Sequence, residues 1–261
     1  MSDPTCGRRR AVALVVAVAV AALAACSGGP GSKAEPSTVV APSLDALSDA
    51  IELVNQGRAT ALDRARKLTS GLERRDAVDA LATTGARSAA GQADPGADEA
   101  MTQAVRALDD LGPALEAYQR GIDDLGRAAA SPELTTEQRR PLGTVIATAR
   151  VEISATRALA SAVRAGLPSY AALGGHLDEW LRRARAGWYR NEGEAANAYA
   201  VLVGDTRARL EQVRSAVSDA DAARTTAGNR TTDALRLARA ALEPLTTRPT
   251  EVVLSPSELA G

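Results

Sequence analysis

The only histidine of the chain, His176, lies three residues before Glu179. Residues three apart share one face of a helix, and a neutral imidazole beside a carboxylate is a reasonable ligand pair for a divalent metal ion. Two ligands are too few, so Asp178, Glu192 or Glu194 would have to complete the site. The alternative interpretation is a histidine beside acidic residues on a solvated helix face.

The segment from Gly174 to Glu179 has the form GxHxxE. It resembles a short motif of the imelysin family, whose members are exported helical-bundle proteins often linked to metal or iron uptake. The resemblance implies metal binding through His176 and Glu179, and it makes an imelysin-like uptake protein one hypothesis for this chain. It extends over this segment alone.

Nucleophilic catalysis would also depend on His176, because the chain has no other imidazole. No GxSxG, CxxC, HExxH or phosphate-loop signature is present. Acidic residues are abundant on every expected helix, so none of them stands out as a catalytic carboxylate. We therefore expect a protein that is not an enzyme and holds no cofactor, with a hydrolase kept as a further alternative.

A concentration of aromatic residues marks the window 168–199. It holds both tryptophans and three of the four tyrosines of a chain in which only 2% of the residues are aromatic. Trp, Tyr and Arg dominate the hot spots of protein interfaces. We therefore expect a partner-binding surface here, and its candidate residues are Trp188, Tyr189, Arg185 and Arg190.

The same window has a second interpretation, as the bulky end of an alanine-rich core. Tyr170, Trp180 and Trp188 lie near a stripe of apolar residues at helical spacing, which favours a buried position for them. Tyr189 lies off that stripe and is the better candidate for the surface. The sequence leaves both interpretations open.

The N-terminal segment indicates export. Arg8, Arg9 and Arg10 precede an apolar run over residues 11–25, which is shorter than the about 20 residues that cross a bilayer. A positive cluster, a short apolar run and small residues at its end are typical of a signal peptide. The alternatives are a transmembrane anchor that ends in cysteine or a buried hydrophobic helix.

The apolar run ends in Leu23-Ala24-Ala25-Cys26. This resembles the lipobox of bacterial lipoproteins, and the resemblance implies cleavage before Cys26 and a diacylglyceryl group on its sulfur. Two acyl chains hold a protein stably on a membrane, whereas one chain binds only marginally. We therefore expect a lipid-anchored protein on the extracytoplasmic face of the cell membrane.

Net charge and cysteine content further limit the kinds of partner and the kinds of cross-link that the protein can have. The formal net charge is −1, which argues against a nucleic-acid partner, because such binding needs a basic face. Cys6 lies in the expected signal peptide and Cys26 would carry lipid, so no disulfide is available. The expected partners are the membrane, through the lipid, and an envelope protein, a membrane complex or a cell-wall component.

Composition divides the chain into four parts. Residues 1–25 form the signal peptide, 26–42 the lipidated cysteine and a flexible tether rich in Gly, Ser and Pro, 43–246 a helical domain, and 247–261 a loose tail. The helical domain carries the apolar periodicity, so the fold of the protein is expected there.

Apolar residues recur at three- and four-residue spacing along the helical domain, which predicts amphipathic helices. The expected helices cover 44–81, 101–129, 142–167, 170–188 and 199–242, with Arg58 the one break in the first stripe. We expect turns at 91–96, 131–132 and 166–169. The start of the third helix is uncertain because of Pro141, and we expect an interruption of the last helix near Gly228-Asn229. This pattern favours an all-α, antiparallel up-and-down bundle of about four to six helices, with a shallow left-handed coiled-coil wrap.

Overall fold

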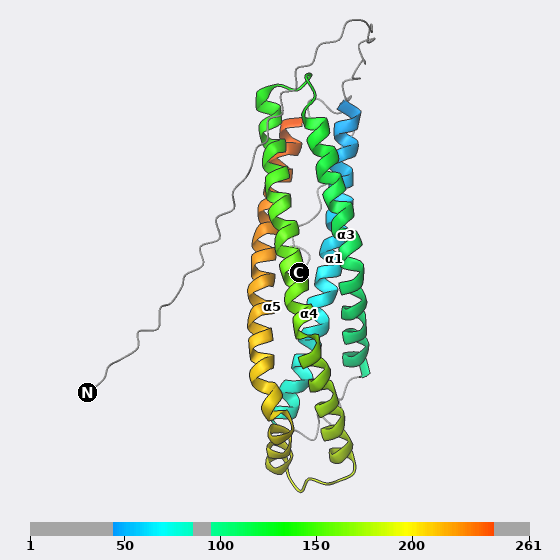
Figure 1. Ribbon diagram of the computed structural model, residues 1–261, viewed down its shortest axis with the longest axis vertical. Coiled ribbons are helices and arrows are strands. Elements are labelled where there is room, and N and C mark those ends of the chain that lie inside the picture. Colours follow the sequence, from blue (N-terminus) through cyan, green and yellow to red (C-terminus); the bar gives the residue numbers. More distant parts are fainter. Residues whose placement is uncertain (1–43, 86–94, 243–261) are drawn as a thin grey trace, which may run out of the picture. The chain divides into compact units, whose positions relative to one another are not determined.

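The computed structural model describes residues 44–85 and 95–242, which form four α-helices and no strand. The helices are α1 (Leu44–Thr83), α3 (Pro95–Ala129), α4 (Thr136–Arg185) and α5 (Glu192–Leu242). Successive helices run in opposite directions along one another (Figure 1). The expected all-α, up-and-down bundle is therefore confirmed.

The helices pack as two antiparallel hairpins, α1 with α3 and α4 with α5. Small residues bring the backbones within each hairpin close together: a Cβ atom at Gly57 would lie 2.7 Å from the Cα atom of Tyr118, and one at Gly166 would collide with Val213. Backbones approach less often between the hairpins, where side chains fill the space. We call this interface between the α1–α3 hairpin and the α4–α5 hairpin the seam.

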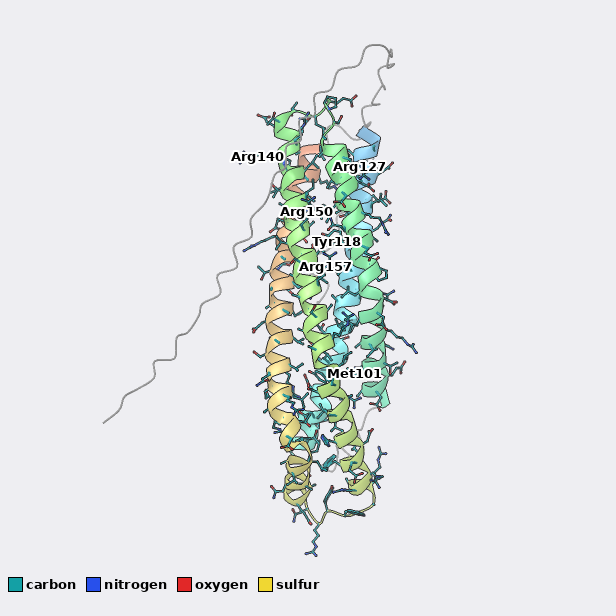
Figure 2. The ribbon with its side chains drawn as sticks, in the orientation of Figure 1. Met101, Tyr118, Arg127, Arg140, Arg150 and Arg157 are labelled. Atoms are coloured by element: carbon teal, nitrogen blue, oxygen red, sulfur yellow. The ribbon has the colours of Figure 1, made fainter. Side chains whose placement is uncertain are left out.

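The second expected helix shows how well the apolar stripe predicts burial. Its stripe residues are buried or half-buried in α3: Met101, Ala104, Leu108, Leu111, Leu115, Tyr118, Ile122, Leu125 and Ala129. Pro113 lies inside the helix but on its exposed side, off the stripe. Charged side chains such as Arg127 and Arg150 lie on the outer faces of the bundle (Figure 2).

The prediction of a turn at 166–169 is wrong. α4, which is 50 residues long, continues through Pro168 without a break. A proline inside a helix costs about 3 kcal/mol through a lost hydrogen bond and a backbone clash. The apolar stripe, however, keeps its register across this point, and Val163, Gly166 and Tyr170 are all buried. Burial of the residues before and after Pro168 in one core offsets the cost of the proline. The third and fourth expected helices are therefore a single helix.

The start of α4 is set by a capping box rather than by Pro141. The Thr135 hydroxyl accepts a hydrogen bond from the Gln138 N–H at 3.3 Å, and the Thr135 N–H donates to Oε1 of Gln138 at 2.8 Å. These bonds satisfy N–H groups that would otherwise lack partners at a helix start. The helix therefore begins before Pro141, which lies within it.

The interruption expected near Gly228-Asn229 is also wrong, because α5 is unbroken from Glu192 to Leu242. Gly228 is buried, and its carbonyl oxygen accepts a hydrogen bond from Nη2 of Arg58 on α1 at 2.7 Å. The glycine therefore lies at a contact between helices and not at a break.

Several expected features lie outside the described residues. They are the signal peptide, Cys26, the tether, part of the turn at 91–96, residues 243–246 of the expected helical domain, and the tail. Of the helices in the part of the chain that the structure describes, none has the length and apolar character needed to cross a membrane.

Candidate functional site

Aromatic side chains of the window 168–199 lie close together at one end of the α4–α5 hairpin. We call this end the tip (residues 180–195; lower end of Figure 1). Gly187 follows the last turn of α4 with φ of 74°, a conformation that glycine adopts without a Cβ penalty. Its N–H donates to the Ala184 carbonyl, and the Trp188 N–H donates to the Arg183 carbonyl. This pair of bonds is a Schellman motif, which ends the helix and directs the chain away from it.

The first turn of α5 is fixed by side chains on the other side of the tip. Oδ1 of Asn191 accepts a hydrogen bond from the Glu194 N–H, and the Glu194 carboxylate accepts one from the Arg190 N–H, both at 2.9 Å. Asparagine is a preferred residue at a helix N-cap for this reason. The turn between the two helices is therefore held by bonds at both ends.

The aromatic side chains of the tip form a stack around Trp180. Trp180 is 1% exposed, and its indole N–H donates to the Ala195 carbonyl at 2.9 Å. Tyr199 meets its ring edge-on at 5.6 Å between centroids, and Tyr189 stacks on it at 6.4 Å with planes 22° apart. Such pairs add about 0.5–1.5 kcal/mol beyond the area that they bury. The stack therefore joins the turn of the tip to both of its helices.

The exposures of Trp188 and Tyr189 are the opposite of what the apolar stripe alone suggests. Trp188 lies near the apolar stripe in the sequence, yet it is 64% exposed. The reason is that α4 ends at Arg185, so Trp188 is no longer part of the helix whose buried face the stripe forms. Tyr189, expected on the surface, is half-buried against the core and against Trp180. Tyr170 and Trp180 are buried as the stripe indicates.

One arginine, Arg183, lies over the exposed ring of Trp188. The guanidinium of Arg183 lies over this ring at 5.5 Å from its centroid, which is a cation–π contact. Arg182 and Arg183 both bind the carboxylate of Glu179, Arg183 through Nε to Oε1 at 2.6 Å. Arg185 and Arg190 are exposed. The four candidate residues for partner binding thus lie together in one turn.

The two expected metal ligands already have other partners. Nε2 of His176 lies 3.2 Å from Oγ1 of Thr206 on α5, within hydrogen-bonding distance. The hydrogen bonds from Arg182 and Arg183 lower the pKa of Glu179 below its usual value. Glu194 caps α5 as described above. Within residues 44–85 and 95–242, no group of three or more His, Cys, Asp and Glu side chains is arranged to hold a metal ion.

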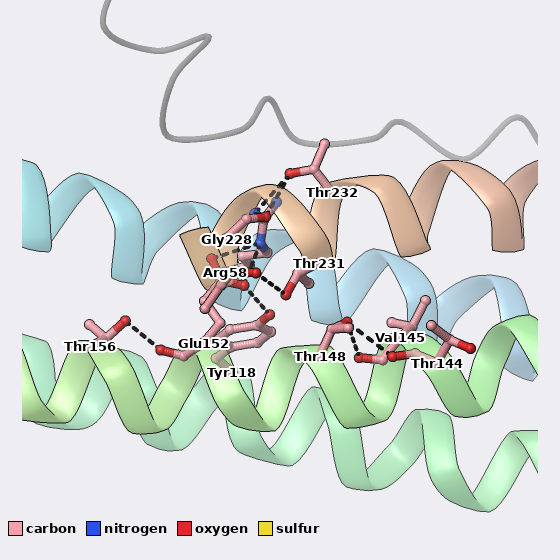
Figure 3. Close-up of polar contacts among 11 residues, drawn as sticks. Arg58, Tyr118, Thr144, Val145, Thr148, Glu152, Thr156, Gly228, Thr231 and Thr232 are labelled. Carbon is pink, nitrogen blue, oxygen red and sulfur yellow. Dashed lines mark hydrogen bonds and ion pairs between the residues drawn. The ribbon is translucent and has the colours of Figure 1, made fainter. Parts of the chain in front are cut away.

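A central polar cluster, which the sequence analysis did not identify, joins all four helices across the seam (Figure 3). Nε of Arg58 on α1 donates to both carboxylate oxygens of Glu152 on α4, at 3.1 and 2.9 Å. The Tyr118 hydroxyl on α3 donates to Oε2 of Glu152 at 2.9 Å, and Nη2 of Arg58 reaches the Gly228 carbonyl and the Thr232 hydroxyl on α5. The side chains of Arg58 and Glu152 are 0% and 2% exposed, so the cluster holds helices together and does not face solvent.

The signal for this cluster was the break at Arg58 in an otherwise apolar stripe. A charged residue on a buried face requires a partner, because an unpaired charge in the core is very costly. The pKa of Tyr118 is well above its usual value because the ring is buried and its hydroxyl faces the Glu152 carboxylate. The identity of the partner, 94 residues away, cannot be read from local spacing.

A second polar cluster, the Arg214 cluster, lies nearer the tip. Arg214 on α5 binds Asp76 at 2.7 Å and Asp79 at 2.8 Å, both on α1. The Tyr170 hydroxyl on α4 donates to Oδ2 of Asp76 at 3.0 Å, and the Tyr199 hydroxyl on α5 donates to Oδ1 of Asp79 at 2.6 Å. This cluster therefore connects α1 to both helices of the other hairpin.

The environment of the Arg214 cluster shifts its titrating groups. Burial and the adjacent Asp76 carboxylate raise the pKa of Tyr170, and burial together with the hydrogen bond to Asp79 raises the pKa of Tyr199. Burial alone would lower the pKa of the Arg214 guanidinium, but the two aspartates raise it above its usual value. The tyrosines therefore stay neutral and the arginine charged.

Comparison of the chain with protein-family models, with curated proteins and with solved structures found no match.

Proposed function

We propose that this chain is an exported lipoprotein, held on the cell membrane by lipid on Cys26, whose helical bundle is a non-enzymatic binding or scaffolding module at the cell envelope. The anchor is supported by the arginines, the apolar run and Leu23-Ala24-Ala25-Cys26 at the N-terminus. Its partner is an envelope protein, a membrane complex or a cell-wall component, met at the tip.

The observation that carries the binding proposal is the exposure of Trp188 in a fixed position. Trp188 is 64% exposed, yet Arg183 covers one side of its ring and the Schellman motif fixes its backbone. An exposed ring that is already held loses little conformational freedom on binding. Arg185, the last residue of α4 and three positions before Trp188 in the sequence, is exposed. Trp and Arg are the residue types that contribute most to interface hot spots.

The position of the tip along α1 also supports the proposal. α1 begins at Leu44, next in sequence to the tether, and a Cβ atom at Gly85, just beyond its other end, would collide with the Glu192 carbonyl of the tip. A helix of 40 residues is about 60 Å long. In a protein anchored through Cys26, the tip therefore lies one helix length from the attachment of the tether, where it can meet a partner away from the anchor.

Site-specific photocrosslinking in intact cells tests the proposal. Arg185 is replaced by a photoreactive phenylalanine derivative in the full chain, and Leu237, which is 65% exposed near the other end of α5, is replaced in the control. We expect a discrete adduct from position 185 that disappears when Trp188→Ala is added, and no such adduct from position 237. An adduct that persists in the Trp188→Ala chain would contradict the proposal.

Lipidation is tested separately with Cys26→Ala. The unchanged chain should fractionate with membranes and carry the mass of a diacylglyceryl group, whereas the variant should lack that mass. A lipid-free chain that is cleaved elsewhere would remove the anchor from the proposal but would leave the binding test at the tip unaffected.

A further inference from the structure

The guanidinium of Arg58, in the central polar cluster, uses only two of its three nitrogen atoms in the hydrogen bonds described above. Nε donates to both carboxylate oxygens of Glu152, and Nη2 donates to the Gly228 carbonyl and the Thr232 hydroxyl. Nη1 is buried and has no hydrogen-bond partner among the residues that the structure describes. Because Nη1 of an arginine carries two N–H groups, two donors inside the cluster still require an acceptor.

The acceptor for these donors must be small, buried and uncharged. Arg58 is 0% exposed, so bulk solvent does not reach its guanidinium, and an unbonded donor on a buried charged group is very costly. The positive charge of Arg58 is already matched by the negative charge of Glu152. An anion bound to Nη1 would therefore leave the cluster with an unmatched charge in the core.

The cluster also contains oxygen atoms that can accept further hydrogen bonds. Thr231 is 0% exposed, and its hydroxyl donates its one hydrogen to the carbonyl of Ala227 at 3.1 Å (Figure 3). A hydroxyl oxygen that donates in this way keeps lone pairs with which it can accept. Oε1 of Glu152 accepts from Arg58 and has a further lone pair. The cluster thus offers both donors and acceptors to a molecule that can use both.

We propose that one ordered water molecule lies inside the bundle, accepts a hydrogen bond from Nη1 of Arg58 and donates to buried oxygen atoms of the central polar cluster. Buried waters typically make about three hydrogen bonds to polar groups that would otherwise lack partners. This water lies where α1 meets the other hairpin, so it is part of the seam. The proposal does not depend on the lipid anchor or on binding at the tip.

The position of this water predicts slow exchange with the solvent. The side chains of Arg58 and Glu152 are 0% and 2% exposed, and Tyr118 is 1% exposed. The water can therefore leave only when the two hairpins separate locally at the seam. Its residence time should exceed the time in which the protein tumbles, and it would report how often the seam opens.

Magnetic relaxation dispersion of water oxygen-17 counts the internal waters that stay bound for longer than the protein takes to tumble. The chain from residue 27 is used, which contains every described residue but no lipidated cysteine. We expect the double variant Arg58→Met, Glu152→Met to lose at least one such water, because it replaces the charged pair by apolar side chains of similar size. The matched control Asp63→Met, Lys67→Met removes an exposed ion pair and should keep the number of the parent chain.

The result that would overturn the proposal is an equal number of long-lived waters in the parent chain and in the Arg58→Met, Glu152→Met variant. Far-ultraviolet circular dichroism of both chains shows whether the helices are intact, as this comparison requires. A loss of the same size in the Asp63→Met, Lys67→Met control would overturn the proposal too, because the water would then not belong to the central polar cluster.

A crystal structure of the parent chain tests the site whether or not the double variant folds. At a resolution that shows ordered waters, we expect a density peak at about 2.7–3.2 Å from Nη1 of Arg58. Crystals grown with bromide distinguish water from an anion, because anomalous scattering at this peak would show a halide and overturn the proposal. The absence of a peak beside Nη1 would overturn it as well.

Discussion

Asp79 on α1 accepts a hydrogen bond of 2.6 Å from the hydroxyl of Tyr199 on α5. The ring of Tyr199 meets Trp180 edge-on, and Trp180 stacks on Tyr189 in the turn of the tip. Arg214 holds Asp79 from the other side at 2.8 Å. A continuous line of contacts therefore leads from the seam to the surface that we propose binds the partner.

Tyr199→Phe should remove this hydrogen bond and keep the ring. We expect a loss of about 1–2 kcal/mol in the free energy of unfolding, measured by urea denaturation, because the buried Asp79 loses one of its donors. In a Trp188→Ala background, where Trp180 is the only tryptophan, the near-ultraviolet circular dichroism of the indole should change because Tyr199 no longer holds it in place. Thr206→Val, which breaks the contact with His176 instead, serves as the control for a lost hydroxyl elsewhere on α5. An unchanged Trp180 spectrum in Tyr199→Phe would show that Asp79 does not position the stack.

Arg58→Met should leave Glu152 charged and buried beside Tyr118. We expect a loss of about 3–5 kcal/mol for this single change and a much smaller loss for the double variant Arg58→Met, Glu152→Met, which removes both charges. Urea denaturation of the full double-mutant cycle measures the coupling. Lys67→Met breaks the exposed pair with Asp63 and should cost less than about 0.5 kcal/mol. Additive losses at Arg58 and Glu152 would show that the two charges do not interact as described.

Alkaline titration should reveal the buried tyrosines. The raised pKa values of Tyr118, Tyr170 and Tyr199 mean that these hydroxyls stay protonated in the folded chain while those of the unfolded chain ionise near about 10. Below that pH the unfolded state binds as many protons as the folded state, so these groups add no pH dependence there. Above it the unfolded state binds fewer protons, and stability falls by up to about 1.4 kcal/mol per pH unit for each tyrosine.

The measurement is tyrosinate absorbance recorded together with far-ultraviolet circular dichroism as the pH rises. Ionisation of these three tyrosines should coincide with the loss of helix. Tyrosinate that appears near its usual pKa while the helices are intact would contradict the burial of these hydroxyls.

Pro168→Ala tests whether α4 is continuous. In a continuous helix the alanine restores a backbone hydrogen bond and removes a clash, so we expect a gain of about 1–3 kcal/mol in the free energy of unfolding. Pro113→Ala, at the exposed proline inside α3, should give a gain of the same sign. A loss of stability in Pro168→Ala would instead indicate a turn at that position.

Calorimetric titration with Zn²⁺ tests the resemblance to the imelysin family. Zinc at His176 and Glu179 must displace two arginines from the Glu179 carboxylate and compete with Thr206 for the imidazole. We therefore expect the chain from residue 27 and its His176→Ala variant to give the same weak heats. Saturable binding that is lost in the variant would favour the uptake hypothesis and would make Glu179→Gln the next variant.

The sequence predicts helices and burial well where one local pattern decides both. The stripe in α3 places Leu108, Leu115 and Ile122 in the core as expected. The pattern fails at Pro168. The cost of a proline inside a helix indicated a turn there, but burial of the residues before and after the proline keeps the helix intact. It fails at Trp188 for the opposite reason, because the Schellman motif ends α4 while the apolar spacing continues.

The polar clusters depend on contacts between residues far apart in the chain. The break at Arg58 was visible, but the position of Glu152 at the same level of the bundle depends on how the hairpins pack. Trp188, Tyr189, Arg185 and Arg190 lie close together because they are neighbours in the sequence, so their grouping needed no knowledge of the fold. Which of the two rings lies inside depends on the geometry of the turn between α4 and α5.

The two polar clusters also make the bundle resistant to sliding under load. Arg58 and Asp76 lie 18 residues apart on α1, a distance of about 27 Å along the helix. A shift of α1 by one turn, about 5.4 Å, would separate Arg58 from Glu152 and Asp76 from Arg214 at the same time. A force that pulls α1 lengthwise against α4 and α5 would therefore have to break both ion pairs at once before the helix could slip.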